Sequence, residues 1–366
     1  MTEISRREFV KHSAAASLAV SALPSSLFAN APLSKMGIAS TSFTGGPPPG
    51  GGPRPAGGAT SAANAPRSPQ MQGRDALEFL EKCATFGAGG IQTQLNGDLM
   101  KLRKRADELG MYVEGMVGIP RNSDMSALEK SLADCQAAGV TVVRAAMLGG
   151  RRYETFKTLA EWKAWVDQSY TALRLALPVI EKYKVTVCVE NHKDWTLEDF
   201  LKLLRTYQSQ YLQVCLDFGN NISLLDDPYE VIEGLAPWAK ATHIKDMGVR
   251  PYEDGFLLSE VPLGEGMLDL PRIVATVQKA NPNTKFSLEM MTRDPLKVPC
   301  MTPQYWEVFP DRNIKYLGRT FKLVQKNAGG KPLPMVEQLP RDERVKIEDE
   351  NVRACFRYIN EKKVIA

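Results

Sequence analysis

The chain has 366 residues, of which 43% are hydrophobic and 24% are charged, and its formal net charge is +4. A near-balanced charge without a basic block argues against a nucleic-acid partner. The six cysteines form no CxxC pair and are too sparse for a disulfide scaffold, so we expect Cys188 and Cys215, which lie in apolar runs, to be core residues.

Residues 1–31 have the pattern of a twin-arginine export signal. Arg6 and Arg7 precede a weakly hydrophobic run, SAAASLAVSALPSSLFANA, that ends in small residues. A basic start, a short apolar stretch and a small-x-small ending are typical of exported proteins, and the arginine pair favours the twin-arginine route. We therefore expect a periplasmic or otherwise exported protein that uses the twin-arginine export machinery. An uncleaved signal would tether the protein to the membrane, although Pro24 makes the run a poor bilayer span.

Residues 36–295 alternate β-rich runs with amphipathic helical patterns. The first run covers residues 36–43, and a helix is predicted at 74–87. Between them, residues 44–73 are a Gly/Pro-rich stretch that cannot bury a core, which predicts a flexible insertion after the first strand. Residues 296–366 contain several prolines and helical patches, and we expect this C-terminal extension to pack on the barrel as a helical wrap.

The alternation predicts a (β/α)8 barrel. Seven more strands are expected at 90–95, 111–120, 140–148, 185–191, 212–220, 241–246 and 285–291, with helices at 98–110, 125–139, 159–184, 196–208, 226–240 and 269–281. Continuous apolar strands separated by helices are typical of a parallel sheet covered by helices. The alternative is an open doubly wound sheet, but no GxGxxG motif opens a helix after the first strand.

Polar side chains end four consecutive predicted strands. Glu190 ends the fifth strand, Asp217 the sixth, His243 the seventh and Glu289 the eighth, each after an apolar run. Because side chains alternate along a strand, Cys188 and Glu190 share a face, as do Cys215 and Asp217, and Ser287 and Glu289. All four polar groups can therefore point into the barrel mouth, where the active sites of such barrels lie.

Three carboxylates and one imidazole form an oxygen-rich ligand set. Such a set favours Mn²⁺, Mg²⁺ or Co²⁺, with Zn²⁺ as the alternative. For any one residue alone, a strand-end carboxylate that caps the next helix is an equally good interpretation. The four together predict a site for one divalent metal ion.

With these motifs, residues 36–293 resemble the xylose isomerase-like barrels, often described as sugar phosphate isomerases or epimerases. The motifs are VENH, CLDFGN, HIKD, VPLGEGMLD and SLEM. The resemblance implies that Glu190, Asp217, His243 and Glu289 bind the metal, and that the two glutamates are the catalytic proton-transfer pair. Asn220 stands where some epimerases of this family have a second histidine, which counts against a ketohexose epimerase.

The implied activity is isomerisation or epimerisation of a small-molecule carbohydrate, by proton transfer through a metal-stabilised enediolate. One glutamate removes the α-proton and the other returns it. We expect His192, on the same face as Glu190, to hydrogen-bond a substrate hydroxyl, and Lys245 to hold an oxyanion. Arg250 and Arg144 are weaker candidates for substrate binding. A loop histidine that faces water, and a salt bridge from Lys245 to a nearby carboxylate, are the alternative interpretations.

Export favours a substrate without phosphate, because phosphorylated sugars are scarce outside the cytoplasm. Two other functions stay open: a lyase or hydratase acting on 3-keto-glycosides, and a non-catalytic periplasmic sugar- or metal-binding protein. AP endonucleases of this fold need several zinc ions and many histidines, whereas only His192 and His243 lie beyond the export signal. The sequence leaves the oligomeric state open.

Overall fold

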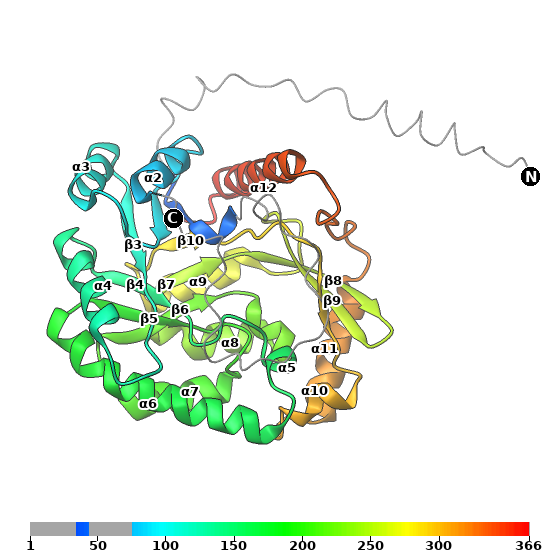
Figure 1. The fold of residues 1–366 in the computed structure, drawn as a ribbon. Coiled ribbons are helices and arrows are strands. Elements are labelled where there is room, and N and C mark those ends of the chain that lie inside the picture. The colour runs from blue at the N-terminus through cyan, green and yellow to red at the C-terminus, as the bar shows by residue number, and fades with distance from the viewer. Residues whose placement is uncertain (1–33, 44–74, 366) are drawn as a thin grey trace, which may run out of the picture. The chain divides into compact units, whose positions relative to one another are not determined.

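The computed structural model describes residues 34–43 and 75–365, and these form a closed barrel of eight parallel strands surrounded by helices (Figure 1). The barrel strands are β1 (Met36–Ala39), β2 (Gly90–Thr93), β3 (Tyr112–Met116), β4 (Val142–Ala145), β5 (Thr186–Glu190), β6 (Leu212–Asp217), β7 (Ala239–Ile244) and β10 (Phe286–Leu288). Each pairs with the strand before and after it in this order, and β1 closes the barrel by pairing with both β2 and β10. The predicted barrel is therefore confirmed. The expected export signal at 1–31 and the insertion at 44–73 lie outside the described residues.

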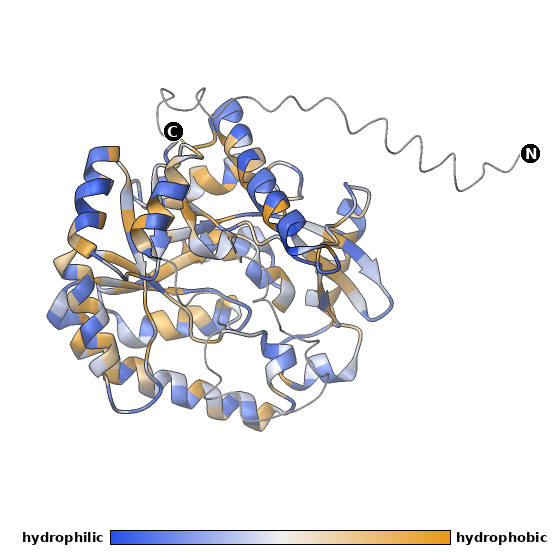
Figure 2. Cartoon of the chain, turned by 45° about the horizontal axis from the view of Figure 1, so that its top comes forward, coloured by the Kyte–Doolittle hydropathy of each residue, from blue (hydrophilic) through white to orange (hydrophobic). Residues whose placement is uncertain are grey.

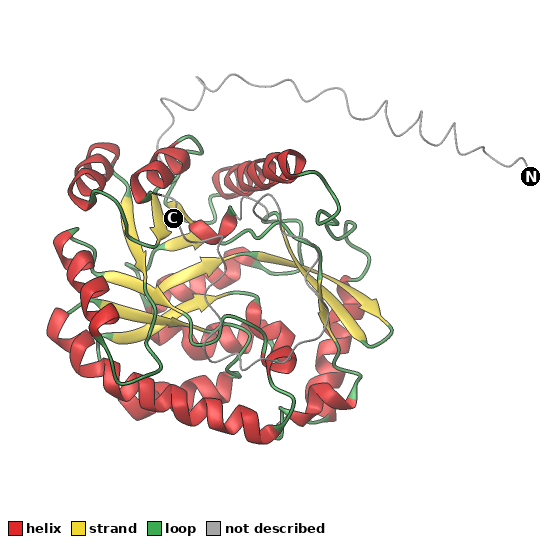
Figure 3. Ribbon diagram, viewed as in Figure 1, coloured by secondary structure: helices red, strands yellow, loops and turns green. Residues whose placement is uncertain are grey.

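Helices follow the barrel strands and form an outer ring (Figure 3). They are α2 (Ala76–Ala84), α3 (Leu99–Leu109), α4 (Ser126–Ala137), α5 (Arg152–Thr155), α6 (Leu159–Tyr183), α7 (Leu197–Tyr207), α8 (Pro228–Leu235) and α9 (Leu270–Ala280). Local sequence sets their ends: Thr196 and Asp199 form a capping box at the start of α7, and Gly110 adopts a left-handed conformation after α3. No helix among the described residues is long and apolar enough to cross a membrane.

The larger apolar core lies between the strands and the inward faces of the helices, while hydrophilic residues gather on the outer helices (Figure 2). A separate small cluster of Cys188, Cys215 and Ala241 lines the barrel interior, two residues before the polar strand ends. Tyr112 fills the other side of this interior. A Cβ at Gly37 would lie 2.2 Å from the Tyr112 hydroxyl, so only glycine leaves room there.

A small antiparallel sheet follows the seventh barrel strand, in a region where the sequence analysis predicted only a loop. It consists of β8 (Asp246–Tyr252), β9 (Gly255–Val261) and β11 (Leu296–Val298), in the order β11-β9-β8. Strands β8 and β9 form a hairpin that pairs Tyr252 with Gly255 across a two-residue turn. This hairpin projects to one side of the barrel (Figure 1).

The C-terminal residues form three helices: α10 (Pro303–Glu307), α11 (Ile314–Asn327) and α12 (Arg341–Lys362). Tyr305 of α10 is buried and donates a hydrogen bond to the carbonyl of Ser223, after barrel strand β6. Asp349 of α12 pairs with Lys82 of α2, and Asn351 donates to the Thr292 hydroxyl beyond β10. These contacts join the last helices to elements on both sides of the barrel mouth.

Candidate metal centre

Four neighbouring barrel strands supply the four polar side chains predicted as metal ligands. Glu190 and Asp217 are the last residues of β5 and β6, His243 is the penultimate residue of β7, and Glu289 directly follows β10. The register places His243 opposite Asp217 on one side and opposite Ser287 on the other. Parallel pairing thus brings all four side chains to the same end of the barrel.

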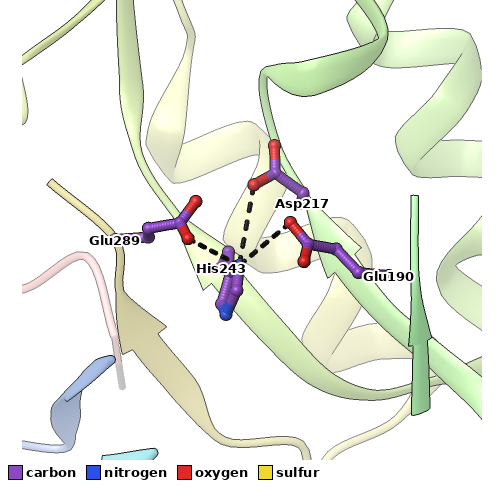
Figure 4. A group of neighbouring side chains, drawn as sticks. All are labelled: Glu190, Asp217, His243 and Glu289. Atoms are coloured by element: carbon purple, nitrogen blue, oxygen red, sulfur yellow. Dashed lines mark hydrogen bonds and ion pairs between the residues drawn. The ribbon is translucent and has the colours of Figure 1, made fainter. Parts of the chain in front are cut away.

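The four side chains converge on one point (Figure 4). One ligand atom from each residue lies within 4.8 Å of the ligand atoms of the others, and all four residues are buried. His243 Nδ1 is 3.3 Å from Glu190 Oε1, 3.5 Å from Glu289 Oε1 and 3.8 Å from Asp217 Oδ2. The sequence-predicted ligand set is therefore assembled as one group.

Cations hold the two glutamates of this group ionised, whereas burial outweighs Lys245 at Asp217 and raises the pKa of that carboxyl. Arg144 of β4 donates two hydrogen bonds to Glu190 Oε2, one of them from Nε at 2.6 Å. Lys245 pairs with Asp217 Oδ2 at 2.7 Å and with Glu289 Oε2. Burial alone raises the pKa of both glutamates, but Arg144 and His243 at Glu190, and His243 and Lys245 at Glu289, outweigh it and lower each pKa well below the ordinary value.

A hydrogen-bond chain behind His243 selects its tautomer. Gln92 Nε2 donates to Glu114 Oε2 at 2.9 Å, so the Gln92 amide oxygen faces the imidazole, 2.6 Å from His243 Nε2. Nε2 must therefore carry a proton, and Nδ1 is the nitrogen that faces the carboxylates. These carboxylates raise the pKa of His243 although burial lowers it, so the imidazole is cationic until a metal ion displaces its Nδ1 proton. Burial raises the pKa of Glu114 to about 7. The sequence analysis named neither Gln92 nor Glu114.

The donor set fits a divalent metal ion. It offers three carboxylates and one imidazole nitrogen, with the other imidazole nitrogen held by an acceptor, as metal-binding histidines usually are. Asp217 Oδ2 is buried and makes no hydrogen bond of normal geometry among the described residues, although Lys245 lies near it. A buried carboxylate oxygen of this kind is suited to bind a cation.

The structure brings three of the four residues predicted to bind substrate to this centre. Arg144 and Lys245 reach it by pairing with the ligand carboxylates. His192 lies beside it with Nδ1 buried and without a hydrogen-bond partner, and burial and Lys193 lower its pKa to about 3, so the ring is neutral and can serve a substrate hydroxyl. Arg250 is different: its guanidinium donates to the carbonyls of Val249, Gly330 and Lys331, and it lines a cavity of about 470 Å³ whose lining contains Glu260 but none of the four predicted ligands.

Three further charged residues lie at the same end of the barrel and were missed by the sequence analysis. Glu260 of β9 is buried and accepts hydrogen bonds from Arg293, with Arg293 Nη2 2.8 Å from Glu260 Oε1. Lys245 Nζ lies 3.9 Å from the same oxygen. Lys193 is buried and donates to the side chain of Asn220, which itself donates to Glu190 Oε1 at 3.0 Å. Lys193 follows the VENH motif directly. Its position in the β5–α7 loop is the only feature of the sequence that indicates a residue of the site.

Comparison with known proteins gives one family and one curated relative. The family model described as "Xylose isomerase-like TIM barrel" matches residues 80–307. A 3-oxo-isoapionate decarboxylase of Pectobacterium atrosepticum is 30% identical over 211 residues, which cover 55% of this chain and 72% of that protein.

Solved structures with this fold are more distant in sequence. A xylose isomerase-like TIM barrel protein from Mycobacterium smegmatis, in complex with magnesium, is 14% identical, with a TM-score of 0.46 over 80% of this chain and 97% of the other. A 3-keto-D-glucoside 4-epimerase from E. coli is 12% identical, with a TM-score of 0.46 over 69% of this chain and 95% of the other.

Proposed function

Because the chain belongs to the xylose isomerase-like TIM barrel family and is an enzyme of that kind, we propose that it is a divalent-metal-dependent isomerase or epimerase of a non-phosphorylated sugar or keto-sugar. The observation that carries the proposal is the convergence of three carboxylates and His243 Nδ1 at the barrel mouth. The export expected from residues 1–31 favours a substrate without phosphate.

In this proposal, Glu190, Asp217, His243 and Glu289 hold the metal ion. When bound, the ion supplies positive charge that stabilises negative charge developing on the oxygens of a carbonyl substrate. Arg144 and Lys245 keep Glu190 and Glu289 ionised, and Lys245 also holds Asp217 in place.

Glu190 and Glu289 move the proton in opposite directions, and the structure makes them unequal. Arg144 clamps Glu190 Oε2 with two hydrogen bonds, and the Glu190 side chain is fully buried. The Glu289 side chain is 6% exposed and pairs with Lys245, whose ammonium also pairs with Asp217. Glu289 is therefore the better base, because it shares its cation with a second carboxylate, whereas Arg144 donates two hydrogen bonds to Glu190.

Deuterium exchange tests this function directly. Metal-loaded protein incubated in D₂O with a panel of keto-sugars should incorporate deuterium at the α-carbon, as read by NMR. Glu289→Gln should lower the exchange rate by roughly 10²–10⁴-fold, the usual contribution of a general base, while sugar binding is retained. Glu265→Gln is a matched control, because Glu265 is an exposed carboxylate that pairs with Lys331 and is not one of the four predicted ligands. Metal-loaded wild-type protein that exchanges no α-proton on any keto-sugar would exclude an isomerase or epimerase.

A second candidate function is decarboxylation of a 3-oxo sugar acid. The relative at 30% identity is named as such a decarboxylase, and the cations beside Glu190 and Glu289 make both carboxylates weak bases. Decarboxylation breaks the bond to the carboxylate carbon and leaves its electron pair on the α-carbon, so no base is needed to start it. Release of ¹³CO₂ from a carboxyl-labelled 3-oxo acid, with one deuterium gained from D₂O, would identify this reaction. Exchange without CO₂ would identify the isomerase or epimerase.

A further inference from the structure

Lys193 is a buried cation without a carboxylate partner. The residue is 3% exposed, and its ammonium donates to the Asn220 side-chain oxygen. Among residues 34–43 and 75–365, no carboxylate oxygen lies within 4.0 Å of the Lys193 ammonium. Arg144, Lys245 and Arg293, at the same end of the barrel, each pair with at least one carboxylate. A buried charge without a counter-charge is costly, and such groups in proteins are normally paired or bind a ligand.

The loop that carries Lys193 is rigid, so the position of the ammonium is not accidental. The Lys193 carbonyl accepts a hydrogen bond from the Arg152 amide at 2.8 Å. On one side, Asn191 bridges to the Asp217 backbone through both its amide atoms. On the other side, the Asp194 carboxylate accepts the amides of Leu148 and Trp195 and is therefore turned away from the ammonium.

Asn220 connects this cation to the metal ligands. Its side-chain oxygen accepts from Lys193 and its side-chain nitrogen donates to Glu190 Oε1. One amide group therefore separates the ammonium from a predicted metal ligand.

The charge balance of this end of the barrel points in the same direction. The carboxylates of the network are Glu190, Asp217, Glu260 and Glu289, and its cations are Arg144, Lys193, Lys245 and Arg293. With His243 neutral, as a metal-bound imidazole is, the two sets cancel. A bound divalent ion therefore gives these groups an excess of positive charge, which an anionic ligand would neutralise.

We propose that the substrate is a sugar acid, and that Lys193 Nζ receives its carboxylate while the polyhydroxylated chain extends to the centre formed by Glu190, Asp217, His243 and Glu289. This inference rests on the proposed function, and it narrows the substrate class within it. Lys193 is a substrate-binding residue in this arrangement, and Asn220 positions it.

Calorimetric titration with two unreactive probes tests the proposal. L-Threonate and L-threitol share a four-carbon chain and differ by one carboxylate. Mn²⁺-loaded wild-type protein should bind threonate at least about tenfold more tightly than threitol, the size of one charge-assisted hydrogen bond. Lys193→Met should lose this preference, whereas threitol binding and Mn²⁺ affinity stay unchanged. Lys193→Arg should keep most of the preference, because it keeps the charge.

Thermal unfolding separates a binding role from a structural one. Lys193→Met replaces an unpaired buried charge by an apolar side chain of similar length, so its Tm should equal or exceed that of the wild type. Lys326→Met is the matched control, because Lys326 is an exposed lysine outside the charge network and should affect neither probe.

The outcomes distinguish this inference from the proposed function. A threonate preference that persists in Lys193→Met, or a Tm that falls sharply in that variant, would overturn the inference and leave the metal centre intact. Wild-type protein that binds Mn²⁺ but does not prefer threonate over threitol would also overturn the inference without affecting the metal centre. Wild-type protein that binds no divalent metal would overturn the proposed function, and the inference with it.

Discussion

Gln92 fixes which nitrogen of His243 faces the three carboxylates. Its amide oxygen accepts from His243 Nε2 because its amide nitrogen is committed to Glu114. Groups of this kind, one shell behind a metal ligand, set the tautomer and the ring orientation, and their loss typically weakens metal binding by 10–100-fold. The interior of β2 and β3 thus contributes to a centre whose ligands come from β5, β6, β7 and β10.

We predict that Gln92→Leu lowers the affinity for Mn²⁺ by roughly 10–100-fold, because His243 loses the acceptor that holds its Nε2 proton. Calorimetric titration of metal-free protein with Mn²⁺ measures the change. Gln213→Leu is a suitable control: Gln213 lies in β6 and its side chain donates to the Ser209 carbonyl, outside the chain that ends at His243. Equal Mn²⁺ affinity in wild type and Gln92→Leu would mean that His243 is oriented by its packing alone.

Single residues differ in how well the sequence predicted them. Glu190 and Asp217 could be predicted because strand period and strand ends place them at the barrel mouth. Gln92 and Glu114 could not, because they lie inside strands that the sequence does not align with β7. Whether Gln92 meets His243 depends on the stagger of strands around the closed barrel, which local patterns do not encode.

At the scale of elements, Asp246 joins two motifs that are separate in the sequence. It ends the HIKD motif, and its carboxylate accepts four backbone amides: those of Met247 and Leu268 at Oδ1, and those of Gly264 and Gly266 at Oδ2. A Cβ at Gly266 would lie 2.2 Å from Asp246 Oδ1, so glycine allows this approach. HIKD and VPLGEGMLD are therefore joined at the open end of the β8–β9 hairpin, where Asp246 pairs with Val261.

We predict that Asp246→Ala lowers the stability of the protein by about 2–4 kcal/mol, because buried amide donors of the loop lose their acceptor. The Tm of the variant, measured by circular dichroism, should fall accordingly. Asp254→Asn changes an exposed aspartate at the β8–β9 turn and should stay within about 0.5 kcal/mol of the wild type. If Asp246→Ala and Asp254→Asn unfold at the same temperature, water replaces the carboxylate at little cost.

The β8–β9 hairpin shows why one element was missed although its signal was present. Asp254 and Gly255 are an Asp-Gly pair, the dipeptide most typical of hairpins. In the structure the two turn residues are Glu253 and Asp254, one position earlier, and Gly255 begins β9 with a φ of 152°. Pro251 within β8 argues against a strand, and Pro is tolerated there because β8 lies at the edge of its sheet. The repeating strand–helix pattern predicts no further sheet, so it indicates only a loop between the seventh barrel strand and the next helix.

For the whole molecule, stability and chemistry lie in different layers. The apolar core between strands and helices is extensive, whereas the barrel interior contains small side chains and a network of buried charges. Most such barrels fill their interior with branched apolar side chains. Here the outer apolar layer must stabilise the fold, because the interior of the barrel is polar. The predicted metal ligands come from four strands that are neighbours in the barrel order.

Metal removal should therefore change the stability of the whole barrel. An ion bound by Glu190, Asp217, His243 and Glu289 would join β5, β6, β7 and β10, and it would bind the folded state alone, because these residues are distant in sequence. At a free concentration of 100 times its Kd, such an ion stabilises the fold by about 2.7 kcal/mol. For a barrel of this size we expect Mn²⁺ to raise the Tm by roughly 4 °C and EDTA to reverse the change. Asp217→Asn should abolish most of the response, because it removes a ligand charge and leaves the other three in place. A Tm that responds to Mn²⁺ equally in wild type and Asp217→Asn would place the ion elsewhere on the protein and refute this centre.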